Sequence, residues 1–508
     1  MTAGSCAEPF ERDEPVAIID IGSNSGRVVV YRIDAAGQLR LLASTRAALR
    51  LVREVDSGHT LGPQAVARAL AALRDFRAIA LGAGARRVVT VATAAVRDAR
   101  DGAELIARVR RELGLEIHVI DGEEEAHYGF LGALHGLPFE DGLLFDMGGG
   151  SLQVTRFRRR RPLSAVSLPL GALRLSQAFL RSDPPDDAQR RRLRRHVRAL
   201  LEGAGIGPLR AGDVLVGTGG TVRNLAKVDR RAHGYPITRV HGYALARRRV
   251  RDITDLLAAR RQRKRDSLPG LSDERGDSIV GGAEGIATLM QVCGARELHV
   301  SGQGVREGLA FNLVDGYVPS VERVRAASIA SLVARFDGWR ADSAERRAAL
   351  GHRLGRVLLP RRAGELLAAL VLAARLLDVG RSLDFFDRHE HTADIVLATE
   401  LNGYTHREIA LLSAVLRRAG DDKADEHLLS PLLRDDEHAD IERAAVILAL
   451  ADDVEERCPP HGPIEIHCRL SEDALRVQVP RLLAWRERGL DRRFERAFGR
   501  RLRVQPAA

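Results

Sequence analysis

The sequence predicts an α/β protein with two similar lobes and a cleft between them, followed by a mostly α-helical domain. Strands alternate with helices over roughly the first 300 residues, which is typical of an α/β layer. A strand–Asp–x–Gly–strand pattern occurs twice, and helical periodicity dominates from residue 316 onward. Because 508 residues exceed what one hydrophobic core supports, we expect domains at 1–130, 131–315 and 316–508.

The first lobe is predicted from short β-branched runs and one long amphipathic segment. Valine- and isoleucine-rich runs predict strands at 16–20, 26–33, 88–92 and 116–120, and the leucine-rich stretch 39–43 is expected to form a further strand. Apolar residues at helical spacing predict helices at 64–81 and 103–113. The first strand ends in Asp20 and Gly22 and leaves again as a second strand.

The second lobe repeats this beginning. Strands are predicted at 143–146, 152–157 and 214–216. Asp146 follows Asp20 by 126 residues, and Gly148 follows Gly22 by the same interval. This weak internal repeat predicts a duplicated lobe.

The last part of the chain is predicted to be helical, with a small sheet near its end. Helical runs cover 324–336, 363–377 and 409–418, and the alternating stretches 463–470 and 475–479 predict a hairpin.

Composition limits the partners and the compartment. The formal net charge is +11, and only three of the 79 basic residues are lysines. This charge favours an anionic partner, or else it reflects an arginine-rich coding bias. Four cysteines, an N-terminus without an apolar core, and no apolar stretch long enough for a bilayer predict a cytoplasmic protein without membrane association.

Three glycine-rich turns are the candidate phosphate-binding elements. Glycine lets successive backbone N–H groups point at one anion, and neighbouring hydroxyls add donors. The aspartates that open the first two turns, Asp20 and Asp146, are candidate ligands for a divalent metal. A single such turn is more often structural, but three together favour phosphate binding. The candidate phosphate-binding residues are Gly22, Ser23, Asn24 and Ser25; Gly148, Gly149, Gly150 and Ser151; and Gly217, Gly219, Gly220 and Thr221.

Two further features could act at such a site. Glu124 and Glu125 open a predicted helix, where acidic residues also serve as ordinary caps. Arg97 could clamp phosphate oxygens, although arginine is too common in this chain for its identity to be decisive.

Together these residues resemble the exopolyphosphatase / guanosine pentaphosphate phosphohydrolase (Ppx/GppA) family, in the actin-like ATPase-domain superfamily. The likeness covers about 16–312 and continues more weakly beyond. It depends on the Asp20 and Asp146 loops, the Ala-Thr-x-Ala-x-Arg segment ending at Arg97, the Glu124-Glu125-Ala126 helix start, residues 167–175, residues 217–221, and the Ser-Gly-x-Gly-x-Arg-Glu-Gly segment at 301–308.

The resemblance implies two actin-like (ribonuclease H-like) lobes that hydrolyse a terminal phosphoanhydride with Mg²⁺ or Mn²⁺. The implied substrate is polyphosphate or guanosine pentaphosphate. The sequence shows no guanine-reading motif that would distinguish the two. Glu125 is the expected base for the attacking water, with Glu124 second. A homodimer is also implied. The low aromatic content, 4%, disfavours specific nucleic-acid binding.

The chain departs from the family pattern where a glutamate is usual, at Gln153. Asp101 and His127 are lesser departures. If that glutamate carried the chemistry, the protein would be a catalytically weak or inactive sensor that binds polyphosphate or an alarmone. Otherwise Glu125 would support hydrolysis.

The helical part resembles a degenerate HD-phosphohydrolase-like domain. Asp378 is present, but Leu377 occupies the place of the HD histidine, so His389 and His391 are expected to be ordinary histidines. Strand alternation likewise disfavours a zinc site at Cys458, His461, His467 and Cys468. The basic runs 158–161, 190–195 and 260–265 are expected on solvated faces, or along a track for a long polyanion.

Overall fold

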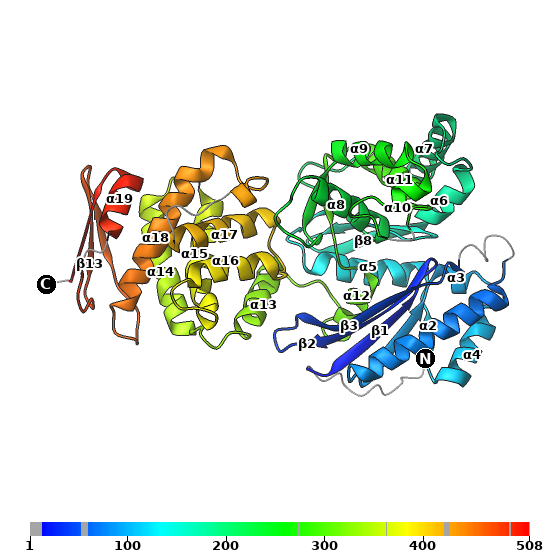
Figure 1. The fold of residues 1–508 in the computed structure, drawn as a ribbon, viewed down its shortest axis with the longest axis horizontal. Helices are drawn as coiled ribbons and strands as arrows, with labels where there is room; N and C mark the ends of the chain where they lie inside the picture. The colour runs from blue at the N-terminus through cyan, green and yellow to red at the C-terminus, as the bar shows by residue number, and fades with distance from the viewer. Residues whose placement is uncertain are drawn as a thin grey trace. The chain divides into compact units, whose positions relative to one another are not determined.

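The structure is a computed structural model that describes residues 13–51, 59–272, 275–361, 363–420, 427–486 and 489–506. It divides into two compact units, one formed by 1–234 with 239–328 and the other by 235–238 with 329–508. The first unit has mixed α/β architecture and the second is mainly helical, as predicted (Figure 1). The boundary between the two lobes of the first unit stays a prediction.

The first lobe is built on a five-stranded sheet in the order β3-β2-β1-β4-β5. Strands β1 and β2 are antiparallel, and β1, β4 and β5 are parallel. The elements are β1 (Pro15–Ile21), β2 (Ser25–Ile33), β3 (Leu39–Ala48), α2 (Gly62–Gly82), β4 (Arg87–Ala92), α3 (Ala94–Arg97), α4 (Gly102–Leu113), β5 (Ile117–Val119) and α5 (Gly122–His135).

The second lobe has a six-stranded sheet in the order β10-β11-β9-β6-β7-β8. Its elements are β6 (Gly142–Met147), β7 (Leu152–Arg158), β8 (Arg161–Leu168), α6 (Ala172–Phe179), α7 (Asp187–Gly203), β9 (Val214–Thr218), α8 (Gly220–Ala232), β10 (Tyr243–Ala246), α9 (Arg247–Ala258), α10 (Gln262–Asp266), α11 (Ile279–Val292), β11 (Glu297–Val300) and α12 (Val305–Asn312).

The two sheets have the same core topology, which supports the predicted duplication. Each sheet begins with three consecutive antiparallel strands. The later strands then pair in parallel with the first of these three. The register is also equivalent, because Asp20 pairs with Arg27 across β1 and β2, and Asp146 pairs with Gln153 across β6 and β7. Gln153 therefore corresponds to Arg27 of the first lobe.

Helices α5 and α12 lie between the two sheets (Figure 1). Phe130 and Leu134 of α5 pack on the second sheet, and Leu309 and Ala310 of α12 pack on the first. The helices approach each other backbone to backbone at Gly132 and Gly308. A Cβ on Gly308 would lie 1.8 Å from the Tyr128 carbonyl oxygen, so only glycine fits there.

We expect Gly308→Ala to lower the free energy of unfolding by about 1–3 kcal/mol, because a helix backbone cannot yield as a side chain would. Urea unfolding of the full chain would measure this. The control is Gly203→Ala at the end of α7, where a Cβ meets no atom within 4 Å. Equal stability of the two variants would contradict the close packing of α5 on α12.

Arg160 departs from the expectation that basic runs lie on solvated faces, since it is only 3% exposed. A guanidinium has five donors, which suits it to the carbonyl groups left unpaired where a helix ends. Arg160 thus fixes the C-terminal end of α5. Its side chain donates to the carbonyl oxygens of Leu134, His135, Leu137, Phe139 and Pro319.

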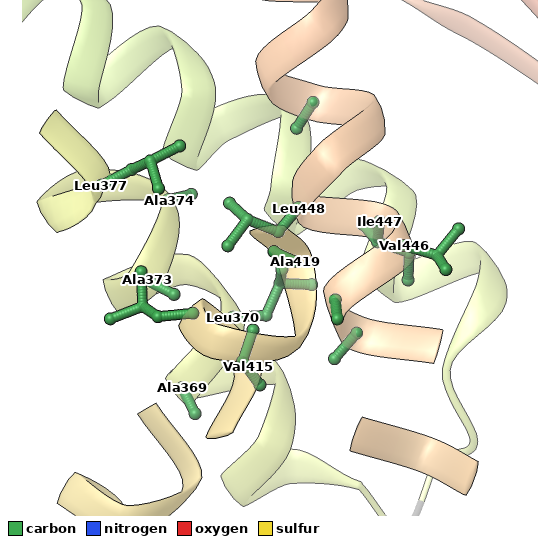
Figure 2. Close-up of a cluster of buried hydrophobic side chains, with 14 of the residues drawn as sticks. Ala369, Leu370, Ala373, Ala374, Leu377, Val415, Ala419, Val446, Ile447 and Leu448 are labelled. Carbon is green, nitrogen blue, oxygen red and sulfur yellow. The ribbon is translucent and has the colours of Figure 1, made fainter. Parts of the chain in front are cut away.

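The second unit has a helical core followed by a three-stranded sheet. Helices α15, α17 and α18 contribute Leu370, Val415 and Leu448 to one hydrophobic cluster (Figure 2). Its elements, including α13, which crosses the boundary between the units, are α13 (Val321–Val333), α14 (Ala341–Leu358), α15 (Gly364–Leu376), η1 (Leu377–Ser382), α16 (Arg388–Ala398), α17 (His406–Gly420), η2 (His427–Leu429), η3 (Asp435–Glu437), α18 (His438–Glu456), β12 (His467–Leu470), β13 (Ala474–Val479), α19 (Leu490–Phe498) and β14 (Arg501–Pro506).

The predicted terminal hairpin is present as β12 and β13, which pair antiparallel. Residues 463–466 lie outside the strand, and β14, which pairs parallel to β13, was not predicted. A parallel partner is contributed by a distant segment, so no local turn signals it.

Candidate active site

The three glycine-rich loops meet at one cavity of about 140 Å³ in the first unit. Each loop follows a strand, β1, β6 or β9, at its carboxyl end, where open α/β sheets usually bind ligands. Most of the predicted site residues line this cavity. They are Asp20, Gly22, Ser23, Asn24, Ser25, Glu125, Asp146, Gly148, Gly149, Gly150, Ser151, Gly219 and Gly220.

The first two loops have the same hydrogen bond. Gly22 N–H donates to the Ser25 carbonyl at 3.2 Å, and Gly148 N–H donates to the Ser151 carbonyl at 3.0 Å. Several other N–H groups of the three glycine-rich loops lack a backbone acceptor among the described residues. In the part of the chain that the structure describes, the N–H groups of Ser23, Asn24, Gly149, Gly150 and Gly219 donate to no backbone carbonyl.

Helix α8 adds its N-terminus to the same cavity. Gly219 has φ +101°, and a Cβ there would lie 2.4 Å from the Met147 carbonyl oxygen, so only glycine allows the third loop to approach the second. The first N–H groups of a helix lack helical partners and attract anions. The cavity therefore collects backbone donors from three loops.

Three carboxylates, Asp20, Asp146 and Glu125, face this cavity. Burial, with the neighbouring Asp146 and Asp20, raises the pKa of Glu125 to about 8, and burial raises the pKa of Asp146 to about 6. One oxygen of Glu125, Oε2, is buried without a hydrogen-bond partner among the described residues. Crowded carboxylates of this kind favour a cation among them.

The donor set suits Mg²⁺ or Mn²⁺ held partly by water and phosphate. Among the described residues, no group of three or more His, Cys, Asp or Glu side chains is close enough to hold a metal alone. Mg²⁺ commonly uses one or two carboxylates and takes its other ligands from water and substrate phosphate. Asp20 and Asp146 fit that pattern.

Three arginines that sequence reasoning missed, Arg223, Arg275 and Arg306, also line the cavity. Arg306 Nη1 lies 4.0 Å from Asp20 Oδ2, and Arg223 Nη1 donates to the Gly302 carbonyl at 3.3 Å. Arg223 follows the third loop. Arg306 is itself the arginine of the Ser-Gly-x-Gly-x-Arg-Glu-Gly segment, although it was not proposed as a site residue. Arginine identity alone could not single them out in this chain.

Glu307 fixes the start of α12 and therefore Arg306. Its carboxylate accepts hydrogen bonds from Tyr31 Oη at 2.5 Å and from Gly304 N–H at 2.7 Å. Burial alone would raise the pKa of Glu307, but Arg306 and these hydrogen bonds hold it below its usual value. The anionic Glu307 thus balances part of the arginine charge.

Glu124 and Glu125 have different surroundings. Asp121 caps α5, and the Glu124 carboxylate accepts the Asp121 N–H at 3.1 Å and lies 3.2 Å from His118 Nε2. Glu124 is thus part of a capping box outside the cavity, whereas Glu125 faces into it.

Four other predicted residues do not line the cavity. Gln153 is 3% exposed and donates through Nε2 to Ser151 Oγ at 2.8 Å. Arg97 donates to the Ile120 carbonyl at 2.9 Å. Gly217 packs against the Phe145 ring, and Thr221 is buried in the first turn of α8.

The second unit shows no metal site among its described residues. Asp378 pairs with Arg347 and Arg388, each at 2.8 Å, and burial lowers the pKa of His389 to about 4. Cys458 and Cys468 are free thiols. An HD-like relationship of this unit stays a prediction.

Comparison with known proteins agrees with this architecture. The model of the Ppx/GppA phosphatase family matches residues 29–316, and that of Ppx/GppA phosphatase, domain III, matches residues 324–461. Exopolyphosphatase 1 of Mycobacterium tuberculosis is 30% identical over 331 residues, which cover 64% of this chain and 96% of that protein.

Solved structures give the same result. The Ppx/GppA family member of Aquifex aeolicus is 27% identical with a TM-score of 0.53, over 59% of this chain and 97% of that one. An exopolyphosphatase from Cytophaga hutchinsonii is 25% identical with a TM-score of 0.56, over 60% and 99%. The first unit therefore has the actin-like fold of these proteins, and the chain belongs to the Ppx/GppA phosphatase family.

Proposed function

We propose that this protein hydrolyses the terminal phosphoanhydride bond of inorganic polyphosphate or guanosine pentaphosphate. The observation that carries the proposal is one cavity that joins open backbone N–H groups, three arginines and three carboxylates. Phosphoryl transfer depends mainly on positioning and charge stabilisation, and this set supplies both.

The terminal phosphoryl group would bind the N–H groups of Ser23, Asn24, Gly149 and Gly150, with Arg223 and Arg306 on its remaining oxygens. Asp20 and Asp146 would hold Mg²⁺ or Mn²⁺, which neutralises phosphate charge when bound.

Glu125 is the proposed base. Its carboxylate would orient a water molecule and take its proton as the water oxygen bonds to phosphorus. The anhydride P–O bond breaks, and the shortened chain leaves as an anion. A pKa near 8 is close to the working range of a general base, and a bound cation would lower it.

The direct test is phosphate release from polyphosphate and from guanosine pentaphosphate, with Mg²⁺ or Mn²⁺. We expect release from at least one of them. Purified protein that releases phosphate from neither substrate with either metal would refute hydrolysis.

A weak or inactive sensor is the second candidate, motivated by Gln153. Because Gln153 contacts Ser151 and lies outside the cavity, we expect Gln153→Glu to change the turnover number by less than about tenfold, below the share of a general base. Gln153→Ala separates loss of the Ser151 contact from the change of charge. Binding without turnover in the wild type, with turnover appearing in Gln153→Glu, would favour the sensor.

The remaining parts of the proposal concern location and assembly. No helix among the described residues is long and apolar enough to cross a membrane. We propose a cytoplasmic homodimer with domains at 1–130, 131–315 and 316–508, the last being HD-like. Analytical ultracentrifugation would test the dimer.

A further inference from the structure

A second cavity of the first unit, of about 340 Å³, lies among helices α7, α9 and α11. Helices α7 and α9 both pack against α11 (Figure 1). The cavity shares no lining residue with the active-site cavity, and we call it the helix pocket. Sites for small molecules begin at roughly 300 Å³, so the helix pocket is large enough for a small ligand.

Two pairs of arginines line the helix pocket. Arg190 and Arg194 are one helical turn apart on α7, and Arg247 and Arg251 are one turn apart on α9. Like charges at this spacing repel each other. Two carboxylates also line the pocket, so its four arginines and two carboxylates carry a formal charge of +2.

Both carboxylates are engaged by Arg190. Its Nε donates to Glu284 Oε1 and its Nη2 donates to Asp255 Oδ1, each at 2.5 Å. Glu284 is 1% exposed, so its ion pair with Arg190 is buried and joins α7 to α11. The fold itself therefore accounts for Arg190 and for the two carboxylates.

The other three arginines keep most of their donors for a ligand. Arg194 Nη1 approaches Glu284 Oε2 only to 3.6 Å, which is beyond hydrogen-bond distance. Across the part of the chain that the structure describes, the side chains of Arg247 and Arg251 have no carboxylate within 4 Å and no hydrogen-bond partner. Arg247 is half-buried, and a cation that is partly removed from water is stabilised by an anionic partner.

The chemistry of the lining favours a phosphate group. A guanidinium presents its donors in a fork that fits phosphate oxygens, and a phosphomonoester above its second pKa of about 6 carries two negative charges. Within the described residues, no aromatic side chain lines the pocket, so it lacks the ring on which a nucleobase usually stacks. Gln291 on α11 adds an amide that can bond to hydroxyl groups of the ligand.

We propose that Arg194, Arg247 and Arg251 bind the phosphate group of a small ligand without an aromatic ring, which is a phosphomonoester such as a sugar phosphate or inorganic phosphate itself. Arg190 and Glu284 are positioning residues, because their ion pair holds α7 against α11. The site is separate from the active-site cavity, so it does not depend on the hydrolysis proposed above.

Isothermal titration calorimetry of the full chain tests the site, without divalent metal and at about pH 8, where a phosphomonoester is a dianion. The probes are glucose 6-phosphate, inorganic phosphate, succinate and glucose. We expect the two phosphates to bind, succinate to bind more weakly and glucose not to bind. Tighter binding of glucose 6-phosphate would identify a monoester as the ligand, and tighter binding of inorganic phosphate would identify the free ion.

Arg194→Gln, Arg247→Gln and Arg251→Gln should each weaken phosphate binding by about tenfold or more, which is the usual effect of one charge-assisted contact. Arg247→Lys keeps the charge and should retain part of the affinity. The melting temperatures of these variants should equal that of the wild type, which separates loss of binding from misfolding.

The matched controls are Arg195 on α7 and Arg248 on α9, which are exposed and do not line the helix pocket. Arg195→Gln and Arg248→Gln should bind as the wild type does. Arg306→Gln removes a cation of the active-site cavity and so identifies phosphate bound there. The proposal is overturned if the wild type binds neither phosphate, if only Arg306→Gln loses affinity, or if succinate binds as tightly as phosphate.

Discussion

Glu125→Gln should lower the turnover number by roughly 10²–10⁴-fold, which is the usual share of general acid–base catalysis. The amide keeps the shape of the side chain but cannot accept the proton of the attacking water. Glu125 is the carboxylate on α5 that faces the cavity, and its Oε2 has no competing hydrogen-bond partner among the described residues. Steady-state phosphate release under saturating substrate would measure the loss. KM should change little, because the phosphate chain is held by other groups.

The control is Glu124→Gln. Glu124 precedes Glu125, but its carboxylate is part of the capping box of α5. The Glu124→Gln variant should therefore have a turnover number close to that of the wild type. The wild-type rate should rise with pH as Glu125 ionises, and this acid limb should be lost in Glu125→Gln. Full activity of Glu125→Gln, or equal losses in both variants, would assign the proton transfer to another group.

The sequence predicted the loops of the site because their requirements are local. A strand followed by Asp-x-Gly and a second strand needs glycine for the turn, and this pattern is visible without knowing the fold. The structure shows the consequence, since Gly22 and Gly148 donate the same hydrogen bond in the two hairpins. Glu125 was proposed as the base through the family resemblance, because its place at a helix start alone also suits an ordinary cap.

The arginines of the site could not be predicted in the same way. Arg306 is positioned through Glu307, whose partner Tyr31 is 276 residues away in the sequence. Such long-range contacts leave no local pattern, and arginine is the commonest charged residue type in this chain. The buried Arg160 shows the same limit, because only the assembled fold supplies its carbonyl partners.

The internal repeat shows which residue of the first lobe corresponds to Gln153, the position at which the chain departs from the family pattern. Gln153 and Arg27 occupy equivalent places opposite the aspartates of their hairpins, yet Arg27 is a cation near the cleft and Gln153 a buried partner of Ser151. The two lobes therefore share the same hairpin geometry but place different side chains at this position. We propose that the chemistry depends on α5, because its Glu125 faces the cavity whereas Gln153 does not line it.

Arg347→Met should lower the free energy of unfolding of the second unit by about 3–5 kcal/mol. Arg347 on α14 is 1% exposed, and its guanidinium lies 2.8 Å from Asp378 Oδ2 and 2.8 Å from Asp452 Oδ1. Glu455 Oε2 is a third carboxylate oxygen, at 3.6 Å. Methionine fills a similar volume but leaves this group of carboxylates with much less positive charge in a buried site.

Differential scanning calorimetry of the full chain would detect the loss as a fall of roughly 10 °C or more in the transition of the second unit. Arg353→Met is the control, because Arg353 lies on the same helix and is exposed. Two cations remain beside these carboxylates: Arg388 contacts both Asp378 and Asp452, and Arg346 contacts Glu455. They limit the damage without replacing Arg347. Equal melting temperatures of Arg347→Met and Arg353→Met would contradict this prediction. They would show that water or protonation compensates the buried carboxylates, so that the ion pairs of Arg347 do not stabilise the helical unit.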